Sequence, residues 1–246
     1  MAKRGFCVTV YEKESAAGGQ VSLAAKPPHK EKLNWCIEDL LYACEVLGVE
    51  IKYSTEVTKK FIEDEKPYAV ICATGAFAFK PKSIKGTDKE FVYTTTDILD
   101  GRVAIEGKNV VVIGSGMTGL ETAEFLTTMN NKVGVVEMAD DLAPGVWMQH
   151  PNDVIPRLEE KETEFYLSKR LASIVDDGII VEDIKTKSSL KIPADAVVLA
   201  LGSKPENSLY EQLKYMPNVY AIGDASKIGR IADATMSAFK CVKSIN

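Results

Sequence analysis

The apolar and polar residues of this chain alternate in blocks that predict strands and helices in turn. Residues 7–11 (CVTVY) form an apolar, β-branched run that predicts a buried parallel strand ending at Glu12. A second run covers 110–113 (VVVI), and a helical segment continues after Gly119. An apolar strand at 219–222 precedes the helix-like ADATMSAFKCVKSI. This alternation predicts an α/β fold with parallel sheets.

Two stretches share one pattern, an apolar strand that ends on an acidic residue and leads to glycine. They read CVTVYEKESAAGG and KVGVVEMADDLAPG. The match continues downstream, because Glu12 lies 63 positions before Gly75 and Glu137 lies 65 positions before Gly202. Two copies at nearly the same spacing indicate a repeated supersecondary unit.

The second copy contains a glycine-rich loop of the kind that binds dinucleotides. In NVVVIGSGMTGLETAEF a strand leads into Gly114-x-Gly116-x-x-Gly119 and a helix, and Glu137 follows 23 positions after Gly114. Gly114 permits the tight turn, Gly116 lets the backbone approach a pyrophosphate, and Gly119 allows close helix–strand contact.

The first copy starts too near Met1 to hold such a loop. The glycine that matches Gly114 would fall before Met1. We therefore expect this unit to be truncated, as an excerpt or a natural truncation. MAKRGF would then be the end of its first helix, which Gly5 stops.

Acidic residues at the strand ends predict how a nucleotide is held. Glu137 would accept hydrogen bonds from the adenosine ribose, with the pyrophosphate at the N-terminus of the helix. Because Asp140 and Asp141 follow and no arginine comes just after Glu137, we expect NADH rather than NADPH. Glu121, one turn into the helix, is either a cofactor contact or an ordinary polar helix residue.

A further signal is NVYAIGDASKIG near the end of the chain. Asp224 at a strand end can accept hydrogen bonds from ligand hydroxyls, and Gly223 permits close approach of the ligand to the backbone. The alternative is an aspartate that only caps a turn.

Composition narrows the function classes. The net charge of −5 argues against a nucleic-acid surface. No apolar run reaches the roughly 18 residues of a membrane helix, and no signal peptide is visible. The five cysteines show no CxxC pair, so we expect small buried hydrophobic residues in a reducing cytosol and no metal ligands. KPPHKEK is expected to be a solvated loop, and His29 and His150 to lie in Pro-flanked loops without a catalytic role.

Taken together, VTVYEK, GGQ, ICATGA, VVVIGSGMTGLETAEF, VVLALGSKPEN and VYAIGDA resemble flavoproteins with two dinucleotide-binding domains. GGQVSLAAKPPHKEK narrows this resemblance. From about Arg4 onward the chain resembles the C-terminal reductase region of old-yellow-enzyme-type NADH:flavin oxidoreductases, the group of 2,4-dienoyl-CoA reductase, enoate reductase and trimethylamine dehydrogenase. The resemblance implies two Rossmann-like three-layer domains: an NADH domain at 104–216 inserted into a truncated FAD domain at 1–103 and 217–246.

The resemblance also implies the cofactor sites. The NADH site would comprise Gly114, Gly116, Gly119, Glu137 and Gly202. Glu121 would either belong to this site or be an ordinary polar helix residue. The FAD site, incomplete without its pyrophosphate loop, would comprise Glu12, Gly19, Gln20, Ala73, Thr74, Gly75, Gly223 and Asp224. FMN, an iron–sulfur cluster and the catalytic acid would belong to a (β/α)8 barrel domain upstream, so we expect no catalytic residue here.

The implied function is transfer of a hydride from NADH to FAD, with electrons passing on to the absent barrel. Two alternatives remain: a free-standing NADH:flavin or disulfide reductase of the thioredoxin-reductase kind, and a non-enzymatic ADP- or NAD-binding module. The absent CxxC counts against the disulfide version. Because truncation would leave apolar surface uncovered, a homo-oligomer is also possible.

Overall fold

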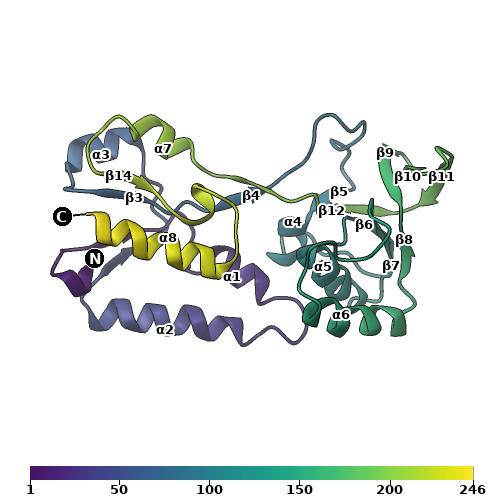
Figure 1. Cartoon of the computed structure of the whole chain (residues 1–246), viewed down its shortest axis with the longest axis horizontal. Coiled ribbons are helices and arrows are strands. Elements are labelled where there is room, and N and C mark those ends of the chain that lie inside the picture. Colours follow the sequence, from purple (N-terminus) through teal and green to yellow (C-terminus); the bar gives the residue numbers. More distant parts are fainter. Residues whose placement is uncertain (246) are drawn as a thin grey trace. The chain divides into compact units, whose positions relative to one another are not determined.

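The chain divides into two compact units in the computed structural model, which describes residues 1–245. Residue 246, the last of the predicted 217–246 segment, lies outside the described residues. Unit 2 comprises Leu23–Glu31 and Ala78–Gly202. Unit 1 comprises Met1–Ser22, Lys32–Phe77 and the chain from Ser203 onward, so each unit combines segments that are distant in sequence (Figure 1).

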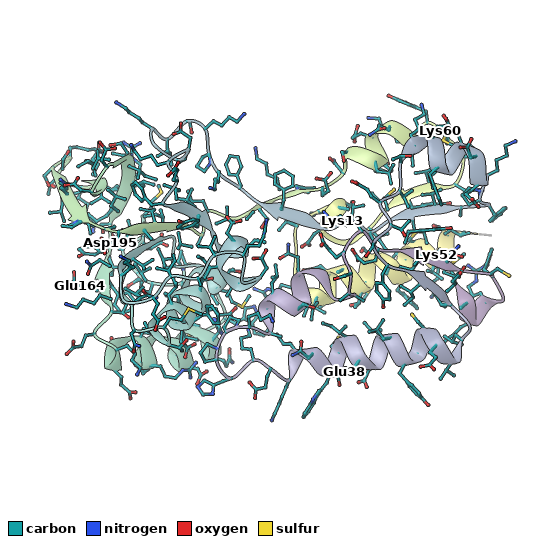
Figure 2. All side chains as sticks on the ribbon, turned by 180° about the vertical axis from the view of Figure 1, so that it is seen from behind. Lys13, Glu38, Lys52, Lys60, Glu164 and Asp195 are labelled. Carbon is teal, nitrogen blue, oxygen red and sulfur yellow. The ribbon has the colours of Figure 1, made fainter. Side chains whose placement is uncertain are left out.

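Unit 2 is built on a five-stranded parallel sheet in the order β5-β12-β6-β7-β8. Its strands are β5 (Val92–Thr94), β6 (Asn109–Ile113), β7 (Lys132–Val136), β8 (Glu164–Tyr166) and β12 (Ala196–Leu199). The unit begins earlier than the predicted boundary at residue 104, because β5 forms one edge of this sheet. Glu164 and Asp195, both labelled in Figure 2, mark the amino-terminal edge of the sheet.

Two hydrophobic cores cover the two faces of this sheet and give unit 2 three layers. Val110 and Val112 of β6 pack toward the helices, whereas Val111 and Ile113 pack toward an antiparallel sheet. The helices are α4 (Thr95–Leu99), α5 (Met117–Thr127) and α6 (Gln149–Glu160), and the antiparallel strands are β9 (Lys169–Val175), β10 (Gly178–Asp183) and β11 (Ser189–Pro193). The continuous apolar run of β6 follows from burial on both faces.

Unit 1 contains three pairs of strands. β1 (Thr9–Tyr11) is parallel to β2 (Glu50–Lys52), and β3 (Val70–Cys72) is parallel to β14 (Val219–Ala221). The third pair joins β4 (Ala76–Ala78) to β13 (Ser203–Pro205). The helices are η1 (Ala2–Arg4), α1 (Gly19–Ala24), α2 (Leu33–Val46), α3 (Lys59–Glu65), α7 (Ser208–Leu213), η2 (Gly223–Ala225) and α8 (Ile231–Ser244).

The strand pairing confirms the internal repeat. In each copy, the strand that precedes the acidic residue pairs in parallel with the next strand along the chain. Val10 is opposite Ile51 in unit 1, and Val135 is opposite Phe165 in unit 2. The same supersecondary unit therefore occurs twice.

The prediction of a buried strand at 7–11 is wrong about burial. Val10 is 41% exposed, and β1 pairs with β2 alone among the described strands. An apolar groove of about 600 Å³ lies beside β1, between α2 and α8, and its lining includes Val8, Leu47 and Val242. β1 is exposed because, among the described residues, no strand pairs with its edge opposite β2, and because the side of β1 that faces the groove is uncovered.

The N-terminal residues form the short helix that the sequence predicts. η1 ends at Gly5, whose φ of +87° is the left-handed conformation that glycine adopts at helix ends. The Arg4 guanidinium donates to the backbone oxygens of Val242 and Ile245 at the end of α8, the second at 2.6 Å. Basic side chains satisfy terminal helix carbonyls in this way.

Several expectations for single residues are corrected. Only Cys72 and Cys241 are buried, and burial raises the pKa of both thiols; Cys36 and Cys44 are half-buried and Cys7 is exposed. Cys7 lies two positions before Thr9, the first residue of the exposed strand β1, and shares its exposure. His150 lies within α6 rather than in a loop, since Pro151 is tolerated in the first turn of a helix.

Residues 1–245 contain neither a bilayer-spanning helix nor a cluster of metal-ligand side chains. None of their helices combines the length and apolar character needed to cross a bilayer. The same residues bring together no group of three side chains suited to holding a metal ion.

Asn131 ties the end of α5 to the start of β6. Its amide donates to the oxygens of Ile105 (2.8 Å) and Leu126 (2.9 Å) and accepts from the Lys108 N–H (3.0 Å). We expect Asn131→Ala to lower the free energy of unfolding by about 2–4 kcal/mol, because buried backbone groups lose their partners. Urea unfolding measures this loss. Thr128→Ala is the control, since it removes an exposed hydroxyl bonded within its own helix and should cost under about 0.5 kcal/mol; equal losses would contradict the prediction.

Candidate functional site

The glycine loop of unit 2 joins the end of β6 to α5 through two close contacts. Gly114 has a φ of +104°, and a Cβ added there would lie 2.6 Å from the Ala200 backbone oxygen. A Cβ on Gly119 would lie 2.1 Å from the Gly114 oxygen. Side chains cannot occupy either position, so the start of α5 lies directly against the ends of β6 and β12.

Gly116 differs from the other two glycines, because the space beside it is open. A Cβ added there meets no atom within 4 Å, and the φ of −59° is accessible to any residue. Gly116 is also the N-cap of α5 and gives the helix no side-chain cap. The N–H groups of the first turn therefore face an open surface where an anionic group can approach them.

The loop lies at the carboxyl edge of the parallel sheet, where the strand order reverses. β6 has β7 on one side and β12 on the other, although β7 follows it in the chain and β12 comes much later. Ligands of open α/β sheets bind at this switch point. Gly202, with a φ of +85°, follows β12 at the same edge and accepts a hydrogen bond from the Phe79 N–H at 3.1 Å.

Glu137 follows β7 at this edge, and its carboxylate is buried and fixed. Oε2 accepts hydrogen bonds from the Ser115 N–H (2.9 Å) and hydroxyl (2.7 Å), and Oε1 accepts from the Ala139 N–H (2.9 Å). Burial alone would raise the pKa of Glu137, but the hydrogen bonds from Ala139, Ser115 and Met138 outweigh it and lower the pKa. A fixed negative charge therefore lies beside the glycine loop.

Glu121 is buried on α5 and forms an ion pair with Lys30. Its carboxylate accepts from the Lys30 ammonium, and the side chains are 5% and 26% exposed. His150, at the start of α6, places its buried Nε2 3.4 Å from Glu121 Oε1 without hydrogen-bond geometry. Glu121 is thus no ordinary surface residue. The expectation of a solvated loop at 26–32 is wrong for Lys30, because its ammonium group forms an ion pair with the buried carboxylate of Glu121.

In unit 1 the structure brings together some of the predicted flavin residues. The Gln20 amide, one residue after the start of α1 at Gly19, donates to the Ala76 oxygen at 3.0 Å. Thr74 donates to the Glu206 oxygen, and the Glu206 N–H donates to the Gly75 oxygen at 2.9 Å. Ala73, exposed, precedes Thr74 in this turn.

The side chains of two other predicted residues of unit 1, Glu12 and Asp224, bond within their own loops. Glu12 follows β1 and accepts from the Glu14 N–H at 2.9 Å. Asp224 accepts from the Gly229 N–H at 3.0 Å, and Gly223, with a φ of +57°, donates its N–H to the Ser237 hydroxyl at 2.8 Å. Among residues 1–245, no hydrogen bond joins the side chains of Glu12 or Asp224 to Gln20 or Thr74.

Sequence reasoning missed two residues of this edge, Ser115 and Lys30. Ser115 is completely buried and connects the glycine loop to Glu137. A hydroxyl residue between two glycines of the motif was a usable signal for it. Lys30 lies in a charged loop that resembles any solvated segment, and no local pattern indicates its partner 91 positions away.

Comparisons with known proteins agree with this geometry. The family model described as "Pyridine nucleotide-disulphide oxidoreductase" matches residues 7–238. An NADH oxidase of Thermoanaerobacter brockii is 34% identical over 97% of this chain, and a cinnamate reductase of Clostridium sporogenes is 31% identical over 99%. The chain spans 37% and 36% of these two relatives.

A solved structure supports the same relationship. The 2-naphthoyl-CoA reductase complex aligns with all of this chain and 37% of its own, with a TM-score of 0.93 and 28% identity. The resemblance to the reductase regions of longer oxidoreductases, expected from the sequence, is confirmed. Since the family model spans nearly the whole chain, the chain belongs to the pyridine nucleotide-disulphide oxidoreductase family.

Proposed function

We propose that unit 2 binds NADH over the β6–α5 loop and that the chain is the reductase portion of an NADH-dependent flavin oxidoreductase. One observation carries this proposal: the open helix start at Gly116 and the fixed carboxylate of Glu137 lie at the switch point of one parallel sheet. The family and its NADH oxidase and reductase relatives support it.

The loop fits the pyrophosphate of a dinucleotide. The first-turn N–H groups of α5 face the open side of Gly116, and helix N-termini favour negative charge. Gly114 and Gly119 place this turn against the strand ends, and Gly202 borders the same edge. The backbone of the loop would hold the phosphates without a cationic side chain.

Glu137 favours NADH over NADPH in this proposal. Its lowered pKa keeps the carboxylate ionised at neutral pH, beside the position of the adenosine ribose. A 2′-phosphate would meet this charge and the neighbouring Asp141, while Asp140 is paired with Lys185 at 2.8 Å. The ribose hydroxyls can instead donate to the remaining lone pairs of Glu137.

We propose that the ion pair between Glu121 and Lys30 stabilises the proposed NADH site by joining the loop 26–31 to α5. Because the Glu121 carboxylate is already paired, we assign it the role of fixing Lys30 and the loop 26–31 next to the start of α5. This pairing leaves no buried carboxylate on α5 without a cation.

For unit 1 we propose the flavin contacts that the resemblance implies. Gln20 and the turn 73–75 would line the flavin, Glu12 would accept from its ribose, and Asp224 beside Gly223 from its ribityl chain. When bound, NADH and FAD supply the hydride chemistry, and the protein supplies binding and orientation. We further propose a cytoplasmic location, and an FMN- and iron–sulfur-containing barrel domain as electron acceptor.

The proposal is tested by titrating NADH into the protein and by following NADH oxidation with FAD and an artificial acceptor. Saturable NADH binding with FAD-dependent oxidation supports it. Binding without oxidation would support the NADH site alone and count against hydride transfer to FAD on this chain, and the absence of NADH binding would overturn the proposed site.

Gly116→Val should abolish NADH binding and leave the fold intact. The side chain enters the open space that the pyrophosphate needs, yet its Cβ meets no protein atom within 4 Å. We expect the Kd measured by calorimetry to rise more than about 100-fold, since several charge-assisted bonds are lost. Thr128→Val is the control, because it places the same side chain at an exposed position at the opposite end of α5. An unchanged Kd in a folded Gly116→Val protein would refute the loop assignment.

Glu137→Arg should narrow or reverse the preference for NADH. The substitution exchanges a charge that repels a 2′-phosphate for one that attracts it. The measurement is the ratio of Kd values for NADPH and NADH. Asp141→Arg makes the same charge change at an exposed position of the same loop and should alter the ratio less. Equal affinities for NADH and NADPH in the unmutated protein would contradict the proposed role of Glu137 in selecting NADH.

A further inference from the structure

Ser115 makes more hydrogen bonds at the glycine loop than the nucleotide motif requires of that position. It is 0% exposed, its hydroxyl donates to Glu137 Oε2 at 2.7 Å, and its N–H donates to the same oxygen at 2.9 Å. Its hydroxyl oxygen also accepts from the Ala143 N–H at 3.0 Å. The residue thus connects the loop after β6 with the loop after β7.

These contacts leave the Ser115 hydroxyl one orientation. A serine hydroxyl has a single proton, and the Ala143 N–H can only donate. The proton must therefore point to Glu137, whose carboxylate can only accept. A charge-assisted bond of this kind is among the stronger hydrogen bonds in proteins.

The bonds from Ser115 also fix the rotation of the Glu137 carboxylate. Oε2 receives both Ser115 donors and Oε1 receives the Ala139 N–H, on a side chain that is 9% exposed. A glutamate held by fewer bonds could turn away and admit a larger anionic ligand. Here a turn of the carboxylate would leave the Ser115 hydroxyl without an acceptor in a buried place.

We propose that Ser115 is a positioning residue that determines nucleotide specificity: it holds the Glu137 carboxylate against the adenosine ribose and thereby excludes nucleotides with a 2′-phosphate. This inference rests on the proposed NADH site. It identifies the ligand class as adenine dinucleotides with a free 2′-hydroxyl. It also attributes the selectivity between NADH and NADPH to two residues, Ser115 and Glu137.

Ser115→Ala tests the assignment, with Kd values for NADH and NADPH measured by calorimetry. We expect the NADPH-to-NADH ratio of Kd values to fall roughly tenfold, as one lost charge-assisted bond implies. Ser115→Cys, which keeps the shape with a weaker donor, should give an intermediate ratio and serves if the alanine variant does not fold. Thr122→Val is the control: it removes an equally buried hydroxyl on α5 that donates to the Thr118 oxygen one turn earlier in the helix, and the ratio should not change.

A double-mutant cycle with Glu137→Gln separates positioning from a general structural role. If Ser115 acts through the charge of Glu137, Ser115→Ala should change the ratio less than about twofold in the Glu137→Gln background. An equal fall in both backgrounds, or an unchanged ratio in Ser115→Ala alone, would overturn the role of Ser115 while NADH binding stands. If the unmutated protein does not bind NADH, the proposed function fails, and this assignment fails with it.

Discussion

The arrangement of the site depends on one close approach, that of helix α5 to the end of strand β6. Because a Cβ on Gly119 would lie 2.1 Å from the Gly114 oxygen, the helix can begin this close to the sheet only with glycine at that position. The approach sets where the first-turn N–H groups point and brings Ser115 within reach of Glu137. Site and fold therefore share a single steric condition.

The close approach of α5 to β6 is stabilised by the burial of both faces of the parallel sheet. Val110 and Val112 enter the core with α5, and Val111 and Ile113 enter the core with the antiparallel sheet. A strand buried on both faces cannot shift its register without moving apolar side chains out of a core. The glycine loop therefore begins at a rigid point, as the proposed nucleotide site requires.

The sequence alone predicted this half of the molecule well, for physical reasons. A glycine-rich turn, a fully apolar strand and an acidic residue at a set distance each have a local cause, so Gly114, Gly116, Gly119 and Glu137 could be read from pattern. The exposure of β1 could not be predicted from the sequence pattern, because the burial of a strand depends on which other elements cover it. The partnership of Lys30 with Glu121 was equally invisible, since it joins positions that only the tertiary fold brings together. The flavin residues of unit 1 remain predictions.

The pairing of Lys30 with Glu121 has a consequence for anyone who wishes to express unit 2 by itself. A continuous clone of 78–202 would contain the whole parallel sheet yet omit Leu23–Glu31, which belongs to the same compact unit. The 5%-exposed Glu121 side chain would then lack its cation, a loss on the order of a few kcal/mol for a buried pair. A stable minimal protein would need the short segment supplied through an engineered linker.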